Sequence, residues 1–384
     1  MKVAVLGYGT VGAGVYSMLS DAPGMEAGPV LVRPGKAVES FMVSDAALIF
    51  GDPTVDAVVE TLGGLDPAYS YGMRALEAGK HFITANKAMV AAHGLELAAL
   101  AREKGAAFLF SAACGGGVPF LHNLALSAEI DRIEAVSGIL NGTTNYMLDA
   151  MQRRGLSYGD ALREAQSLGY AESDPTADVS GLDALRKMQL ACAVAFGVLP
   201  QSGMLCEGME HFTAADVEDI QSRGLVCRLM ASGSRAGESV SAYVEPALFP
   251  RAAPESSVFT NNNMARYTGK HCGSIVLMGQ GAGRFPTASA VLRDLAAAQQ
   301  GARSMFPENC RAAEADNREA VHSYYIRTGG FAAVRLPLRS VLVQGEVVRA
   351  VTEPMSAEKM HALAQNIRKD GNDLFFAALE EELC

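Results

Sequence analysis

The sequence lacks the features that mark several classes of protein. Its seven cysteines are odd in number and scattered, with no CxxC pair, which argues against a disulfide scaffold and a zinc site. No apolar run approaches the roughly 20 residues of a membrane span, and the opening "MKVAVLG" lacks the basic end and cleavage site of a signal peptide. The net charge of −10 argues against a general nucleic-acid binder. We therefore expect a reduced, cytoplasmic protein without membrane or nucleic-acid partners.

Length and apolar content indicate a chain with a substantial core. Of its 384 residues, 49% are apolar and 19% are charged. This length exceeds one ordinary hydrophobic core and favours two or three domains.

A glycine-rich turn follows the first apolar run. "KVAVLGYGTVGAGVYSML" reads as strand, turn and helix, with Gly7, Gly9 and Gly12 in the GxGxxG spacing. The first glycine allows the tight turn, the second lets a pyrophosphate approach the backbone, and the third lets the helix pack on the strand. The helix N-terminus, with Thr10 and Val11, offers N–H groups to phosphate. We predict a dinucleotide site; the alternative is a plain glycine turn in an α/β domain.

Strands and helices then alternate through the first third of the chain. The expected strands are residues 28–33, 55–64, 81–86 and 106–113, and the expected helices are residues 67–80 and 87–105. Near-continuous apolar strands between helices predict a parallel sheet covered on both faces. Ligands of such sheets bind beyond the carboxyl ends of the strands. The residues placed there, around the nicotinamide end of a cofactor, are Thr61, Gly63, Gly64, Asn86 and Lys87.

The end of the second expected strand bears on the choice of cofactor. Domains that prefer NAD usually end this strand with an acidic residue on the ribose 2′-hydroxyl. Here "VLVRPGK" has no carboxylate and brings Arg33 and Lys36 instead. A basic end suits a 2′-phosphate, so NADP is favoured over NAD. In the alternative, Arg33 stacks on the adenine and either cofactor binds.

An acid-rich stretch, "GYAESDPTADVSGLDALRKMQLA", precedes an apolar helix. Asp183 and Lys187 are four residues apart, on one face of a helix expected to begin near Asp178 or Ser180. An exposed ion pair of this kind would contribute only about 0.3–0.5 kcal/mol. Asp174, which precedes a proline, is better explained as turn chemistry.

Two longer segments carry a family resemblance. "ILNGTTNYML" (139–148) and "GYAESDPTADVSGLDALRK" (169–187) resemble the two signature segments of homoserine dehydrogenase. "TLGG", "TANKA", "GGGVP" and "GQGAGRFPTASAV" match in the same order, so the resemblance covers roughly residues 1–310. It implies NAD(P)-dependent interconversion of L-homoserine and L-aspartate 4-semialdehyde, in threonine and methionine biosynthesis.

The resemblance also implies roles for individual residues. The implied catalytic residues are Lys187, Lys87 and Asp183, and the implied substrate-binding residues are Glu172, Asp178, Gly142 and Thr143. A zwitterionic amino acid needs anions for its ammonium group, and its hydroxyl needs a proton carrier. We hypothesise that the two lysines share this work, one transferring the proton and the other stabilising the oxygen.

One departure from the family bears on a monovalent cation. The family commonly has a glutamate where this chain has Ser111, and that glutamate binds the cation together with backbone carbonyls. The carbonyls would fall at Cys114, Gly116 and Val118. A serine brings no charge, so a strong sodium site is not expected here, although carbonyls alone could hold a weak one.

Two other functions are weighed against the dehydrogenase. A cysteine-dependent semialdehyde dehydrogenase would use the Cys114 thiolate as nucleophile, with His122 as its partner; more simply, Cys114 replaces a small apolar residue. A catalytically impaired nucleotide-binding regulatory protein is the other class. Only Ser111 favours it, whereas the intact lysines and acids favour an active dehydrogenase.

The expected fold is α/β, with a Rossmann-type sheet, a second α+β catalytic and dimerisation domain, and a small ACT-like tail. The expected domains are residues 1–130 joined again by about 286–310, residues 131–285, and residues 311–384. By resemblance, Gly281 lies near the cofactor, together with Ala282 and Thr287, and the protein forms a homodimer. A divergent ACT-like tail implies an amino acid effector such as threonine; the alternative is a structural dimer extension.

Overall fold

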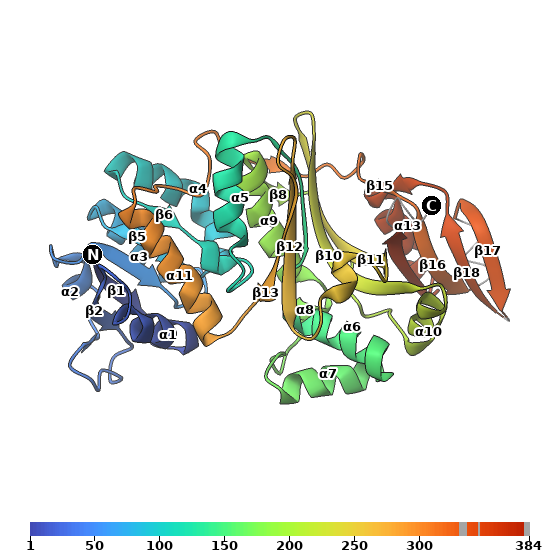
Figure 1. The fold of residues 1–384 in the computed structure, drawn as a ribbon, viewed down its shortest axis with the longest axis horizontal. Helices are drawn as coiled ribbons and strands as arrows, with labels where there is room; N and C mark the ends of the chain where they lie inside the picture. The colour runs from blue at the N-terminus through green and yellow to red at the C-terminus, as the bar shows by residue number, and fades with distance from the viewer. Residues whose placement is uncertain (330–335, 345, 380–384) are drawn as a thin grey trace. The chain divides into compact units, whose positions relative to one another are not determined.

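The computed structural model describes residues 1–329, 336–344 and 346–379 and consists of two compact units (Figure 1). Unit 1 comprises Met1–Arg132, Gln189–Leu199 and Gly279–Ala312. Unit 2 comprises Ile133–Met188, Pro200–Met278 and the described residues from Ala313 onward. In the described part of the chain, no helix is long and apolar enough to cross a membrane.

Unit 1 is built on a parallel sheet. Its strands, counted within the described residues, follow the order β3-β2-β1-β4-β5-β6, the doubly wound order of dinucleotide-binding domains. They are β1 (Lys2–Leu6), β2 (Glu26–Leu31), β3 (Met42–Val43), β4 (Ala57–Glu60), β5 (His81–Thr84) and β6 (Phe108–Leu109). The predicted parallel sheet is confirmed, and the short β3 is an addition to it.

The last strand of this sheet is shorter than residues 106–113, the predicted range. After β6 the chain turns into a 3₁₀ helix, η1 (Ser111–Ala113). The Ser111 amide donates to the buried Asp294 carboxylate at 2.7 Å. That bond takes the place of a ladder bond to a neighbouring strand, so the sheet ends before Ser111.

Helices flank the sheet of unit 1. They are α1 (Thr10–Leu19), α2 (Ala47–Phe50), α3 (Ala68–Glu77), α4 (Lys87–Lys104), α5 (Phe120–Ile130) and α11 (Arg284–Gln299). Asn86 caps α4 by accepting from the Met89 amide at 3.1 Å, and Gly105 ends it in the left-handed conformation. The chain returns to this unit through α11, which packs on α1 so closely that a Cβ on Gly14 would lie 2.9 Å from Arg284 Cγ.

The three glycines of the first turn meet different surroundings. Gly7 has φ +98°, a conformation that glycine adopts without strain. A Cβ on Gly12 would lie 2.2 Å from the Gly7 carbonyl oxygen, so α1 packs against the turn only because Gly12 has no side chain. Gly9 is different, because nothing lies within 4 Å of the position of its Cβ. The backbone at Gly9 is therefore open to a ligand.

Unit 2 is built on a mixed sheet of ten strands within the described residues. Its path is β13-β12-β7-β10-β11-β20-β16-β18-β17, with β9 paired to β11. These are β7 (Ile133–Ile139), β9 (Leu205–Cys206), β10 (Leu225–Ala236), β11 (Ser239–Pro250), β12 (Asn262–Gly269), β13 (Gly273–Gln280), β16 (Tyr324–Gly329), β17 (Leu338–Gln344), β18 (Val347–Thr352) and β20 (Leu374–Leu379). The C-terminal strands thus continue the sheet that the central segment begins (Figure 1).

The C-terminal elements also share a hydrophobic core with the rest of unit 2. Ile139, Phe249 and Met264 are buried in one cluster with Tyr324 and Phe376. The helices of this unit are α6 (Gly142–Arg154), α7 (Tyr158–Ser167), α8 (Thr176–Val179), α9 (Leu182–Phe196, whose last residues belong to unit 1), α10 (Ala214–Ser222) and α13 (Ala357–Lys369). The remaining short elements are β8 (Val198–Ser202), η2 (Pro254–Ser257), β14 (Arg311–Glu314), β15 (Val321–His322) and β19 (Met355–Ser356).

The helix expected to begin near Asp178 or Ser180 is present as α9, but it begins later, at Leu182. The structure has two helices, α8 and α9, separated by Ser180 and Gly181. Gly181 has φ +83°, and a left-handed residue cannot continue an α-helix. Asp178 therefore lies near the end of α8, and Asp183 lies in the first turn of α9.

We expect Gly12→Ala to destabilise the protein, because the added Cβ overlaps the Gly7 carbonyl oxygen at 2.2 Å. Overpacking of this kind costs about 1–3 kcal/mol in the free energy of unfolding. Gly9→Ala is the matched control, since its Cβ meets open space and its φ of −79° suits any residue. Urea unfolding measures both variants, and equal midpoints for the two would contradict the expectation.

Candidate active site

Asn141 lies at the centre of the polar cluster in unit 2. It is 4% exposed, and its Nδ2 donates to Asp178 Oδ1 at 2.7 Å and to Asp183 Oδ2 at 3.0 Å. Its Oδ1 accepts from the Thr144 amide at 2.8 Å, which caps α6. Thr143 Oγ1 lies 3.0 Å from Asp178 Oδ2 and 2.5 Å from the Tyr170 carbonyl oxygen. Two carboxylates are thus held together because each receives donors.

Lys187 completes the cluster from the next turn of α9. Its Nζ donates to Asp183 Oδ2 at 2.7 Å and to the Leu140 carbonyl at 2.6 Å. The two side chains are only 13% and 14% exposed, so the i,i+4 pair is largely withdrawn from water rather than an exposed surface pair. The predicted pairing of Asp183 with Lys187 is confirmed.

The other two acids of the stretch lie apart from this cluster. Glu172 is exposed in the loop before α8, and its backbone carbonyl accepts from Gln166 at 3.2 Å. Asp174 accepts from the amide and hydroxyl of Thr176 at 3.1 and 2.6 Å, and these bonds lower the pKa of Asp174. Asp174 therefore forms the turn that the sequence indicated.

Asn141 is absent from the residues singled out in the sequence, and Gly142 and Thr143 were chosen instead. Gly142 begins α6, and a Cβ there would lie 2.8 Å from the Asn261 carbonyl oxygen, so this position has no room for a side chain. An asparagine before "GTT" is a common N-cap pattern. That signal could have located Asn141, but only as a helix cap and not as the donor that joins two acids.

A second cluster lies at the carboxyl ends of β4 and β5 in unit 1. The buried Glu60 accepts from the Leu62 amide at 2.6 Å, from the Gly63 amide at 3.2 Å and from Thr84 Oγ1 at 2.5 Å. Thr84 Oγ1 in turn accepts from the Asn86 amide at 2.9 Å. Glu60 thus fixes the "TLGG" loop and the start of α4, a role that sequence analysis missed because its carboxylate is buried at the end of an apolar run.

The predicted cofactor residues of unit 1 gather at this edge of the sheet. Thr61 Oγ1 donates to the Leu6 carbonyl at 3.0 Å, which joins the end of β4 to the end of β1 beside Gly7. Asn86 Nδ2 donates to the Gly64 carbonyl at 2.6 Å. Lys87 follows as the first residue of α4. The glycine turn, the "TLGG" loop and the start of α4 therefore form one continuous edge.

Arg33 and Lys36 lie beyond the end of β2 and are exposed. They bound a turn in which the Lys36 amide donates to the Arg33 carbonyl at 3.0 Å, with Gly35 at φ +78°. Both basic side chains therefore project from the loop that follows the second strand, as the sequence pattern indicates.

Two family models match the chain in consecutive ranges. The model described as "Homoserine dehydrogenase, NAD binding domain" matches residues 7–111, and the model described as "Homoserine dehydrogenase" matches residues 119–296. A homoserine dehydrogenase of Synechocystis sp. is 37% identical over 319 residues, which are 77% of this chain and 72% of that protein. One of Corynebacterium glutamicum is 38% identical over 317 residues, which are 77% of this chain and 71% of that protein. A solved homoserine dehydrogenase structure from Thiobacillus denitrificans has a TM-score of 0.86 at 30% identity, covering 99% of this chain and 98% of that one.

This chain belongs to the homoserine dehydrogenase family. It is therefore an NAD(P)-dependent oxidoreductase that acts on a CH–OH group and interconverts L-homoserine and L-aspartate 4-semialdehyde, a step toward threonine and methionine. The predicted family and fold class are confirmed. The two other functions weighed above, a regulatory protein and a cysteine-dependent dehydrogenase, are not favoured. Cys114 is also completely buried, which keeps its thiol from an aldehyde.

At the position expected for the cation, Ser111 meets the carboxylate of Asp294, which lies on α11. Ser111 turns its hydroxyl to Asp294 Oδ1 at 2.5 Å, and the Val118 carbonyl accepts from the Phe120 amide at 2.7 Å. A Cβ on Gly116 would lie 2.4 Å from the carbonyl oxygen of Gly281, so these two backbones are in close contact. Within the described residues, no cluster of three His, Cys, Asp or Glu side chains could hold a metal ion.

Asp294→Asn tests the electrostatics at Ser111. Complete burial raises the pKa of Asp294 to about 7, and hydrogen bonds from Ser111 oppose this shift. An unfolded aspartate titrates near 3.9, so the folded state binds the extra proton and stability is lost as pH rises from about 4 through 7. The free energy of unfolding of Asp294→Asn, relative to the parent protein, should rise across that window by up to about 4 kcal/mol.

Urea unfolding at a series of pH values measures this difference. Asp21→Asn, at an exposed position, is the control and should leave the pH dependence unchanged. A difference between Asp294→Asn and the parent that stays flat from pH 4 to 8 would contradict the assignment.

Proposed function

We propose that the cluster around Asn141 binds homoserine and that Lys187 transfers the proton of its hydroxyl. Asp178 supplies negative charge for the substrate ammonium group, and Asp183 orients the hydroxyl. Thr143 and Gly142 touch the substrate at the start of α6, and Glu172 approaches from its exposed loop. The observation that carries this proposal is the convergence of both aspartates on Asn141 in one hydrogen-bonded cluster, with Asp183 and Lys187 largely withdrawn from water.

The two hydrogen bonds of Lys187 suit a proton carrier. The Leu140 carbonyl and the Asp183 carboxylate hold its Nζ at a fixed point, which lowers the entropy lost when a substrate oxygen arrives. In the reducing direction the charged lysine donates to the nascent alkoxide, and in the oxidising direction the neutral amine accepts the hydroxyl proton. Lys87 shares this work by stabilising the charge on the substrate oxygen.

The nucleotide is held by unit 1, and when bound it supplies or accepts the hydride. Gly9 leaves its backbone open, and the N-terminus of α1 directs the amides of Thr10 and Val11 at phosphate. Thr61, Gly63, Asn86 and Lys87 line the edge that receives the nicotinamide end, and Gly281 completes it before α11. Residues 1–130 with residues 286–310 form this nucleotide-binding domain. Arg33 and Lys36 make NADP the preferred cofactor, through contact with its 2′-phosphate.

Homodimer formation through the sheet of unit 2 is part of the proposal. Its end strand β13 leaves Val276 and Met278 38% and 48% exposed, a pattern that suits burial by a second copy of the chain. Residues 311–384 are proposed as a divergent ACT-like extension that takes an amino acid effector. The glycine-bearing loop expected to open it, near residues 327–337, lies partly outside the described residues.

Mixing the protein with homoserine and NADP or NAD tests the reaction directly, through the absorbance of the reduced cofactor. In this assay we expect Lys187→Ala to lower kcat by roughly 10²–10⁴, because it removes the proton carrier. Cofactor affinity should stay nearly unchanged. Arg186→Ala, which removes an exposed cation from the same helix, is the control and should retain parental kcat. Loss of cofactor binding in Lys187→Ala would show that its role is wrongly assigned.

Arg33→Ala tests the cofactor preference. Removing a guanidinium that pairs with the 2′-phosphate should raise KM for NADP about tenfold and leave KM for NAD within about twofold, the loss expected for one charged hydrogen bond. Arg102→Ala, at an exposed position on α4, is the control. Equal increases for both cofactors would instead favour stacking of Arg33 on the adenine.

A further inference from the structure

We infer that Arg368, on the C-terminal helix α13, is a positioning residue for the substrate-binding acids. The inference rests on the proposed roles of Asp178 and Asp183, and it extends the machinery of the reaction beyond residues 119–296, which the family model matches. Arg368 acts through a chain of contacts that lies wholly within unit 2.

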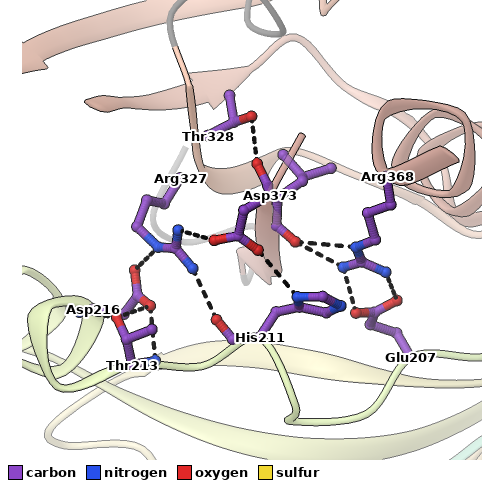
Figure 2. A network of polar contacts seen from close by, with 9 residues as sticks. Glu207, His211, Thr213, Asp216, Arg327, Thr328, Arg368 and Asp373 are labelled. Carbon is purple, nitrogen blue, oxygen red and sulfur yellow. Dashed lines mark hydrogen bonds and ion pairs between the residues drawn. The ribbon is translucent and has the colours of Figure 1, made fainter. Parts of the chain in front are cut away.

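The first contact is a bidentate ion pair between Arg368 and Glu207. Arg368 Nη1 and Nη2 donate to Glu207 Oε2 and Oε1 at 2.9 and 2.7 Å (Figure 2). The Arg368 guanidinium also donates to the Leu374 carbonyl, so its plane is fixed by β20. The side chains of Arg368 and Glu207 are 21% and 10% exposed. A bidentate pair fixes the orientation of the carboxylate as well as its distance from the guanidinium, so it holds the Glu207 side chain in one place.

The second contact joins residues 206–209 to the link between α8 and α9. Cys206 Sγ donates to the Ser180 carbonyl at 3.1 Å, and the Met209 amide donates to the Val179 carbonyl at 3.0 Å. A Cβ on Gly208 would lie 2.3 Å from the Val179 carbonyl oxygen, so the two backbones touch. The segment that Arg368 fixes is thus pressed against residues 179–181.

The third step is covalent. Residues 179–182 join Asp178 to Asp183, the two acids that share the Asn141 amide. The chain turns at Gly181, whose Cβ position is 3.1 Å from Cys206 Sγ. A displacement of residues 206–209 therefore changes the spacing of the two carboxylates. Displacements of about 1 Å at a substrate site can lower rates up to about a hundredfold.

A second arginine of the same region provides a matched control. Arg327 bonds Asp216 and Asp373 through its side chain and also the His211 carbonyl at 2.8 Å (Figure 2). Its side chain is 11% exposed, against 21% for Arg368, and it also ties the C-terminal segment to the rest of unit 2. Two of its partners, Asp216 and His211, lie on and before α10, and Asp373 directly precedes β20, so none lies within residues 206–209.

Arg368→Ala should raise KM for homoserine about tenfold or more, with KM for NADP unchanged, because the nucleotide residues belong to unit 1. Arg368→Lys keeps the positive charge but loses the bidentate hydrogen bonding to Glu207, so it should raise KM for homoserine less than Arg368→Ala does. Arg327→Ala should lower the midpoint of thermal unfolding and leave KM for homoserine at the parental value. If the role of Arg368 is purely structural, Arg368→Ala and Arg327→Ala should both lower the midpoint of thermal unfolding, and neither should change KM for homoserine.

Two further variants separate the possible failures. In the double variant Glu207→Gln/Arg368→Ala, the two increases in KM for homoserine should not multiply, because each change removes the same ion pair. If Arg368→Ala does not fold, Arg368→Lys and Glu207→Gln carry the test, and an unchanged KM for homoserine in both overturns the inference. Asp178→Asn addresses the proposed site itself: an unchanged KM there means that the substrate site is wrong. If KM for homoserine rises in Asp178→Asn but not in the Arg368 and Glu207 variants, the substrate site stands and only the positioning role of Arg368 is overturned.

Discussion

The structure of unit 2 depends on keeping two carboxylates beside one amide group. Asp178 and Asp183 both accept from Asn141 Nδ2, and charges at that separation repel unless donors surround them. The donors are Asn141, the hydroxyl of Thr143 and the ammonium of Lys187. Asn141 also caps α6, the helix that carries Thr143. The hydrogen bonds that hold the two carboxylates therefore also fix the start of α6.

The break between α8 and α9 follows from this constraint. In one continuous helix, residues five apart point about 140° away from each other around the axis, at about 100° per residue. Asp178 and Asp183 could not then share a single amide. The left-handed Gly181 reorients the chain so that both carboxylates face Asn141. The glycine is in the sequence, but the helical periodicity that continues on both sides of it hides the break.

Interactions between near neighbours were predictable, and those between distant segments were not. The GxGxxG turn, the alternation of strands and helices, and the pairing of Asp183 with Lys187 each depend on residues within one turn or one βα unit. Ser111 bonds Asp294 across 183 residues, and Glu207 bonds Arg368 across 161. No local pattern specifies such partners, because their meeting depends on strand order. Asn141 is intermediate: its helix cap is a local signal, whereas its two acidic partners are set by tertiary structure.

The same strand order decides what the C-terminal segment contributes. β20 pairs in parallel with β11 through Ala378 and Leu379 and antiparallel with β16. The last described strand therefore lies between the β10–β11 hairpin and β16. Tyr324 and Phe376 from this segment fill the core beside Ile139, the residue that ends β7 just before Asn141. An extension inserted into a sheet in this way cannot be displaced without uncovering apolar surface next to the cluster around Asn141. The contact between Arg368 and Glu207 is therefore one part of a broader dependence, in which the acids are held by residues that follow them by almost 200 positions.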